Sequence, residues 1–169
     1  KHVTSMEMNF HVHYFVDVSS GEEINKYVKE NQPNLCIFDA STIISSIQIS
    51  QCVYNALETE KLGNMRSKSI YMEILSPDGR LSGAFKHIAV SASTKNAVVI
   101  TFEDKIPEIP GIGKEVNESE FFAKNEPNFE LINEIYQITN DMLKVYSHEE
   151  IILATLAITT TDLVRSRSL

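Results

Sequence analysis

The sequence has few cysteines, prolines and glycines and no tryptophan. Its 169 residues include two cysteines, five prolines, six glycines and no tryptophan. Cys36 and Cys52 match no metal-binding or redox spacing, so we expect both to be reduced thiols of an intracellular protein. A chain of this length buries enough apolar surface to fold without a disulfide or a metal ion.

Long apolar runs are also missing. The longest extends from Ile151 to Ile158, with Thr155 inside it, whereas a membrane-spanning helix needs about 20 residues. Residues 1–7 carry no secretory signal pattern, and we expect them and the tail 165–169 to be flexible. We therefore expect no membrane partner and a single globular domain over 1–169 of an intracellular protein.

Positive charge is scarce as well. The 15 Lys and Arg residues are outnumbered by 23 Asp and Glu residues, which gives a net charge of -8. This total disfavours a free-standing nucleic-acid-binding protein, because binding phosphates requires local positive charge. The charge is uneven, however: 103–134 hold three basic and nine acidic residues, while 61–95 hold six basic and two acidic ones. Either both stretches are ordinary solvated surface, or they face different partners.

Hydrophobic periodicity predicts an α/β fold. Residues 10–16 alternate between apolar and other side chains, as in a half-buried strand. A continuous apolar run predicts a buried strand at 35–38, and the mostly apolar stretches 70–75 and 97–102 predict further strands. We expect a mixed β-sheet of about four to five strands, with helices packed on it and a C-terminal helical segment.

Helix starts are marked by capping boxes, in which a hydroxyl and a side chain three residues later satisfy each other's backbone amides. Ser20, Ser45 and Ser147 each have such a partner, at Glu23, Gln48 and Glu150. Shorter helices are predicted over 81–88 and 129–138. Because prolines and glycines interrupt the acidic stretch, we interpret it as an exposed connection up to the helix at 129.

No catalytic constellation stands out. His11 and His13 could both face a metal ion, but the sequence offers no third ligand near them, so we expect no metal. Phosphate-binding glycine motifs, a nucleophile elbow and a cysteine–histidine pair are all missing, so we expect no cofactor and no enzyme activity. A small intracellular enzyme with a site assembled from distant residues, His11 and His13 included, stays open as the competing hypothesis.

Two surfaces are candidates for binding. The first joins one stripe of the helix that starts near Ser45 to the last helix, whose consecutive apolar residues exceed what one buried face needs. Its candidate residues are Ile49, Val53, Leu57, Ile151, Ile152, Leu153 and Leu156. The alternative is that the last helix is fully packed in the core. The second candidate is the basic loop 61–68 with Lys61, Arg66 and Lys68, for which the alternative is an ordinary solvated loop.

The basic loop also begins a series of short motifs in a familiar order. Lys61-Leu62-Gly63-Asn64-Met65-Arg66-Ser67-Lys68 is followed by Glu73-Ile74, then by Leu75-Ser76-Pro77 and Leu81-Ser82-Gly83-Ala84-Phe85-Lys86. Ile135-Tyr136-Gln137-Ile138-Thr139 comes later. This series resembles the PRPK-binding protein (TPRKB-like) family of the KEOPS complex over residues 8–164, although the stretch 65–76 is a few residues shorter here.

The resemblance implies a mixed α/β domain with a non-catalytic role. It implies binding to the PRPK-type atypical kinase/ATPase of KEOPS and, through that subunit, indirect association with the others. The complex modifies tRNA with threonylcarbamoyladenosine, and the chemistry occurs on another subunit. By this resemblance the apolar helices are the kinase-binding side, and Lys61, Arg66 and Lys68 are candidate tRNA contacts, which the chain alone would bind weakly.

Overall fold

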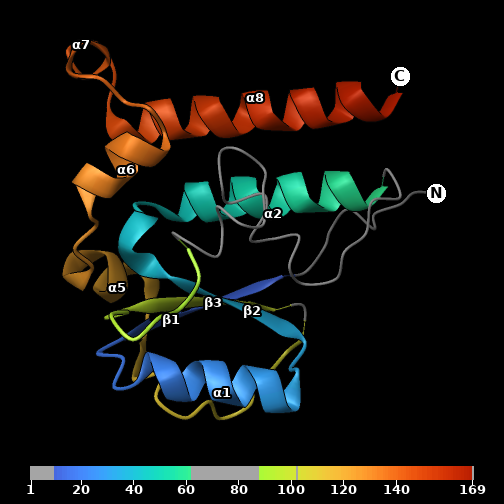
Figure 1. The fold of residues 1–169 in the computed structure, drawn as a ribbon, viewed down its shortest axis with the longest axis vertical. Coiled ribbons are helices and arrows are strands. Elements are labelled where there is room, and N and C mark those ends of the chain that lie inside the picture. Colours follow the sequence, from blue (N-terminus) through green and yellow to red (C-terminus); the bar gives the residue numbers. More distant parts are fainter. Residues whose placement is uncertain (1–9, 62–87, 102, 169) are drawn as a thin grey trace. The chain divides into compact units, whose positions relative to one another are not determined.

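The computed structural model describes residues 10–61, 88–101 and 103–168 (Figure 1). It confirms the predicted α/β class, with a β-sheet and a set of helices. The described chain divides into two compact units, one within Lys1–Asp39 and Val90–Lys124, the other within Ala40–Ala89 and Asn125–Leu169. One domain over 1–169 stays a prediction. Within the described residues, no helix is long and apolar enough to cross a membrane.

The first unit is built on a four-stranded sheet. Its strands are β1 (His11–Val16), β2 (Leu35–Asp39), β3 (Ala97–Thr101) and β4 (Lys114–Val116), in the order β2-β3-β1-β4. All pairings among them are antiparallel, with Val12 opposite Ile100 and Cys36 opposite the same Ile100. The first three strands were predicted; the strand expected over 70–75 lies outside the described residues.

Helix α1 (Gly21–Asn31) covers one face of this sheet (Figure 1). The Ser20 hydroxyl accepts a hydrogen bond from the Glu23 amide at 3.1 Å, as the capping pattern predicts. The Ser20 amide, however, donates to the Gly111 carbonyl at 3.2 Å, where the predicted box has the Glu23 carboxylate. Only glycine fits at position 21, because a β-carbon there would collide with the main-chain oxygen of Ser91. The core between helix and sheet contains Phe15, Ile24, Leu35, Ile37, Val90, Ala97, Val99, Ile109 and Ile112.

The acidic stretch is not the exposed connection that we expected. It contains β4 and the helix α5 (Glu118–Lys124), and Ile109, Ile112 and Phe121 in it are buried. The Phe121 ring lies 4.9 Å from the Tyr14 ring, centroid to centroid. Burial, and secondarily the Glu118 carboxylate, raises the pKa of Tyr14 to about 12. The prediction was wrong because local turn residues do not reveal a distant aromatic partner.

The second unit is helical in its described part. It comprises the short 3-10 helix η2 (Ala40–Thr42), α2 (Ser46–Lys61), α6 (Phe129–Ile135), α7 (Asn140–Leu143) and α8 (His148–Ser168). Helix α6 ends before the expected 138, because Gln137 adopts a φ of 54°, outside the helical region. The helix expected over 81–88 lies almost wholly outside the described residues.

Helix α8 begins with the predicted capping box. The Glu150 amide donates to the Ser147 hydroxyl at 3.1 Å, and the Ser147 amide donates to the Glu150 carboxylate at 2.9 Å. The hydrogen bond from the Ser147 backbone, followed by that from its side chain, lowers the pKa of Glu150. Both hydrogen bonds favour the ionised form of the carboxylate.

We expect Ser147→Ala to lower the free energy of unfolding by about 1 kcal/mol, because the Glu150 amide loses its acceptor. Folding lowers the pKa of Glu150, so the stability that its carboxylate contributes is fully present above the pKa of the unfolded state. This contribution is lost as the pH falls through the pKa of the folded state. Urea unfolding of wild type, Ser147→Ala and Glu150→Gln measures both effects. A Glu150→Gln deficit that grows as the pH falls would contradict this account.

Candidate partner-binding surface

Helices α2 and α8 lie side by side and run in the same direction (Figure 1). Helix α2 is fixed at its start by Gln48, whose side chain is buried. The Gln48 amide donates to the Ser45 hydroxyl, while its side chain donates to the Thr42 carbonyl at 2.9 Å and accepts from the Ile44 amide at 2.8 Å. The Ser45 hydroxyl thus accepts the predicted hydrogen bond, but the Gln48 side chain binds Ile44 and Thr42 of the preceding loop, where the predicted box has the Ser45 amide.

Asn55 joins the two helices through a buried polar contact. Its side chain is fully buried and donates to the main-chain oxygen of Leu156, in α8, at 3.1 Å. The side-chain amide of Gln51, one turn earlier, donates to the Asn55 side-chain oxygen at 2.8 Å. Because a buried amide needs such partners, this contact favours one register of α8 on α2. Nothing in the sequence pattern marked Asn55 beforehand.

Most of the apolar residues that we proposed as partner contacts are buried in the free chain. Buried are Ile49 and Val53 of α2 and Ile151, Ile152 and Leu156 of α8. These five are therefore covered in the free chain, and their direct contact with a partner stays a prediction. Leu57 and Leu153 are half-buried and remain accessible. The spacing of apolar residues predicted the helices, but the stripe it identified is the one that packs within the molecule.

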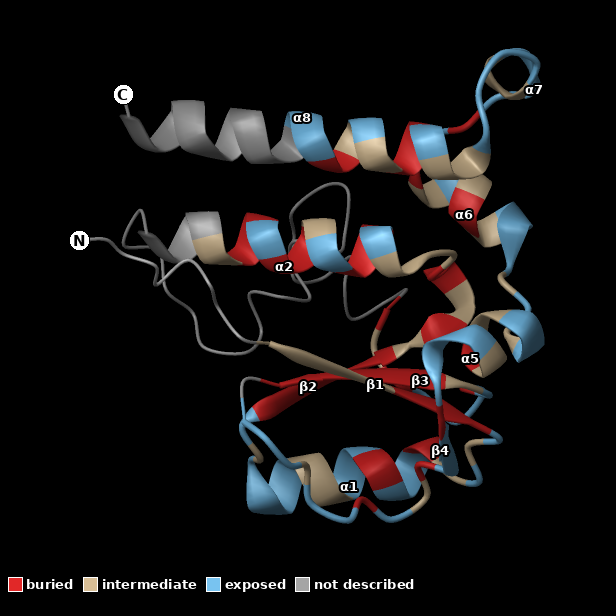
Figure 2. Cartoon of the chain, turned by 180° about the vertical axis from the view of Figure 1, so that it is seen from behind, coloured by how far each residue is buried: buried red, intermediate tan, exposed pale blue. Residues whose placement is uncertain are grey.

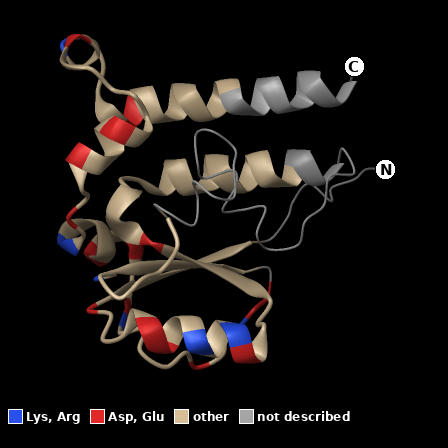
Figure 3. Cartoon of the chain, in the orientation of Figure 1, with Lys and Arg blue, Asp and Glu red and all other residues tan. Residues whose placement is uncertain are grey.

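The outer sides of both helices remain apolar and uncharged. Ile47 and Tyr54 of α2 and Ile158 of α8 are more than half exposed. The sequence holds no charged residue from Ala40 to Leu57 or from Ile151 to Thr161. Charged residues crowd α1, whereas the described side chains of α2 and of α8 after its first turn are uncharged (Figure 3). An outer face of this kind is typical of a surface that contacts another protein.

We use the name helix-pair surface for the accessible apolar residues of the two helices, Ile47, Tyr54 and Leu57 of α2 and Leu153 and Ile158 of α8. In Figure 2, α8 turns its buried residues toward α2 and its exposed ones away.

Burial raises the pKa of two groups in the helical unit, the Cys52 thiol of α2 and the phenol of Tyr136 at the end of α6. A raised pKa favours the neutral form of both side chains.

The basic candidates are placed only in part. Lys61 is the last residue of α2, while Arg66 and Lys68 lie outside the described residues. Their role stays a prediction.

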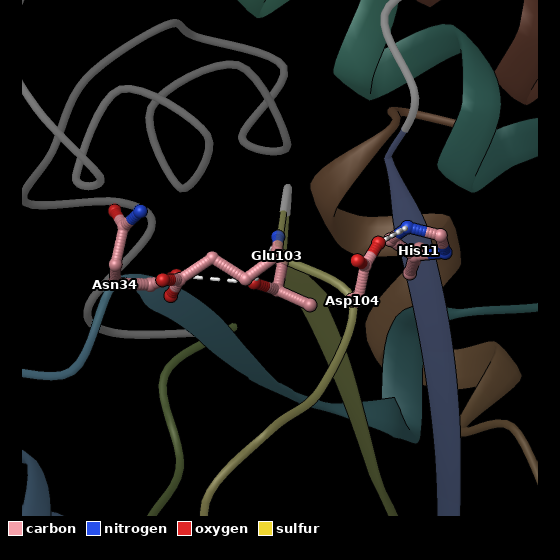
Figure 4. Close-up of polar contacts among 5 residues, drawn as sticks. His11, Asn34, Glu103 and Asp104 are labelled. Atoms are coloured by element: carbon pink, nitrogen blue, oxygen red, sulfur yellow. Dashed lines mark hydrogen bonds and ion pairs between the residues drawn. The ribbon is translucent and has the colours of Figure 1, made fainter.

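The two strand histidines bind separate carboxylates. His11 Nε2 lies 3.7 Å from Asp104 Oδ1 (Figure 4). In the adjacent turn, the Thr101 hydroxyl donates to the Asn34 carbonyl and accepts from the Glu103 amide. His13 Nδ1 lies 2.8 Å from Glu115 Oε2. No group of three or more His, Cys, Asp or Glu in the described part of the chain could hold a metal ion.

Comparison with known proteins gives consistent relatives. The family model described as "Kinase binding protein CGI-121" matches residues 15–160. The chain is 29% identical over 107 residues to the "EKC/KEOPS complex subunit cgi121" of Schizosaccharomyces pombe, covering 60% of this chain and 62% of that protein. It is 23% identical over 147 residues to the CGI121 subunit of Candida glabrata, covering 81% and 83% respectively.

A vertebrate relative extends the set: the "EKC/KEOPS complex subunit TPRKB" of Danio rerio is 28% identical over 94 residues, 54% of each chain. The chain thus spans about three fifths of the fission yeast protein and about half of the zebrafish one. The resemblance drawn from short motifs is confirmed by a match over most of the sequence. The chain belongs to the family of the kinase binding protein CGI-121.

Proposed function

We propose that this chain is a non-catalytic subunit of a KEOPS complex that binds the PRPK-type kinase/ATPase of that complex. The observation that carries the proposal is the family match over residues 15–160, together with relatives that are named as KEOPS subunits. Through this partner it supports the threonylcarbamoyladenosine modification of tRNA in the cytoplasm and nucleus, as the family resemblance implies.

The kinase-binding site in this proposal is the helix-pair surface. Its support is the combination of three exposed apolar side chains with two half-buried leucines on helices that carry no charge there. Covering such side chains by a partner removes apolar surface from water, which is the main favourable term in protein association. The buried residues Ile49, Val53, Ile151, Ile152 and Leu156 belong to the core beneath these accessible side chains.

Co-expression with the KEOPS kinase subunit of the same organism tests the proposal. We expect the two chains to co-purify in equal amounts and to elute together on gel filtration. Separate elution at the concentrations of the experiment would overturn the proposed function.

The proposal includes a tRNA contact through Lys61, Arg66 and Lys68, motivated by the local positive charge of 61–95. Replacing all three by alanine in the assembled complex should weaken tRNA binding and lower the slope of log affinity against log salt by about one per lost phosphate contact. Filter binding over a salt series measures the slope.

The matched control replaces three exposed lysines of the first unit, Lys26, Lys29 and Lys105, by alanine. An equal loss in this control would show that overall charge, and not the loop, governs binding. An unchanged slope in the first variant would remove the proposed contact.

No observation favours the competing enzyme hypothesis. His11 and His13, its named candidates, each lie beside a different carboxylate. Burial also raises the pKa of the Cys52 thiol.

A further inference from the structure

A second apolar patch lies at the corner where α6, α7 and α8 follow one another. Phe129 is 44%, Val145 72% and Tyr146 55% exposed. We call these three residues the corner patch. All of them lie in short segments before the first turn of α8, and none belongs to the helix-pair surface. Leaving three large apolar side chains in water is unfavourable unless something covers them.

The corner patch is held in place by specific contacts. The Phe129 ring lies 4.7 Å from the His148 ring, centroid to centroid, and His148 Nε2 lies 2.8 Å from Asn133 Oδ1. The Thr139 hydroxyl caps α7, and the Tyr146 amide donates to the Met142 carbonyl at 2.9 Å. An ordered surface loses less conformational freedom on binding than a flexible loop would.

The charge around the patch selects its occupant. Residues 126–150 hold six acidic side chains and one basic one, and Lys144, the basic one, is paired with Asp141 at 3.1 Å. Glu130 and Glu134 are exposed and form no ion pair with any described residue. Figure 3 shows acidic residues along α6 and in the first turn of α8. This rim repels phosphates and attracts cationic side chains.

We propose that the corner patch docks a basic amphipathic segment of a second partner protein. The apolar side of that segment covers Phe129, Val145 and Tyr146, while its lysine or arginine side chains pair with Glu130 and Glu134. The corner patch shares no residue with the helix-pair surface. This inference goes beyond the proposed kinase binding and does not depend on it.

Binding of a synthetic leucine–lysine amphipathic peptide to the full chain, followed by fluorescence anisotropy, tests the proposal. We expect binding that the double variant Glu130→Lys/Glu134→Lys weakens roughly tenfold and Tyr146→Ser weakens roughly fivefold. The control Glu22→Lys/Glu30→Lys reverses two exposed charges on α1 and should change affinity less than about twofold. A second control, Leu153→Glu, lies on the other surface and should bind the peptide as wild type does.

Three results would overturn the proposal. These are absence of binding, an equal loss in the α1 control, and unchanged binding by Tyr146→Ser. The second would mean attraction by overall charge, and the third would mean that the apolar patch is not covered. A leucine–glutamate peptide that binds as tightly as the leucine–lysine one would also contradict the assigned chemistry.

Discussion

Leu57→Glu combined with Leu153→Glu should weaken binding to the KEOPS kinase subunit by roughly 100-fold, which corresponds to about 2.7 kcal/mol. Both leucines are half-buried on the helix-pair surface, so a carboxylate at each can reach water in the free chain. In the complex, the partner would cover these carboxylates and remove them from water without a paired cation. Isothermal titration of the purified kinase subunit measures the change.

The matched control is Val145→Glu, which places the same charge on a side chain that is 72% exposed but lies on the corner patch. Its kinase affinity should stay within about twofold of wild type. Circular dichroism and urea unfolding establish that each variant is folded before binding is compared. If the folded double variant retains wild-type affinity, the helix-pair surface is not the kinase-binding site.

Asn55→Asp should lower the free energy of unfolding by about 3 kcal/mol or more near neutral pH. The Asn55 side chain is fully buried, and its amide donates to the Leu156 oxygen. A carboxylate there has no hydrogen to donate to the Leu156 oxygen and places a charge in a fully buried position. The effect should be far larger than that of a typical surface substitution.

The same variant has a defined pH dependence. Burial raises the pKa of this aspartate above its unfolded value of about 3.9. The loss of stability caused by ionising this aspartate is therefore absent below the pKa of the unfolded state. It grows as the pH rises toward the pKa of the folded state. Urea unfolding near pH 4 and pH 7 should show a smaller deficit, relative to wild type, at the acidic pH. Ser50→Asp, exposed on the same helix, is the control, and an equal deficit for Asn55→Asp at both pH values would contradict the buried-charge account.

Local signals in the sequence were good guides to where elements begin. Ser20 and Ser147 cap α1 and α8 as predicted, because a hydroxyl and a backbone amide three residues away need no distant partner. Gln48 lies where the capping pattern puts it, but its side chain binds Thr42 and Ile44. That difference depends on how the loop before α2 turns, which the sequence pattern does not encode.

Distant contacts account for what the sequence analysis missed. Helical spacing identified Ile49 and Ile152, but spacing alone does not say whether an apolar stripe faces water or another helix; here both residues are buried. Phe121 pairs with Tyr14 across more than 100 residues, so the acidic stretch was misinterpreted. One signal in the sequence was available, the absence of charged residues from Ala40 to Leu57. A helix that buries one face usually carries charged residues on the other, so this run indicates an uncharged outer side as well.

Hydrogen exchange of the chain, free and bound to the KEOPS kinase subunit, tests the central claim most directly. The account predicts slower amide exchange in 46–57 and 148–158 on binding, with 21–31 unchanged. Complex formation that protects α1 and leaves both of these segments unchanged would contradict it.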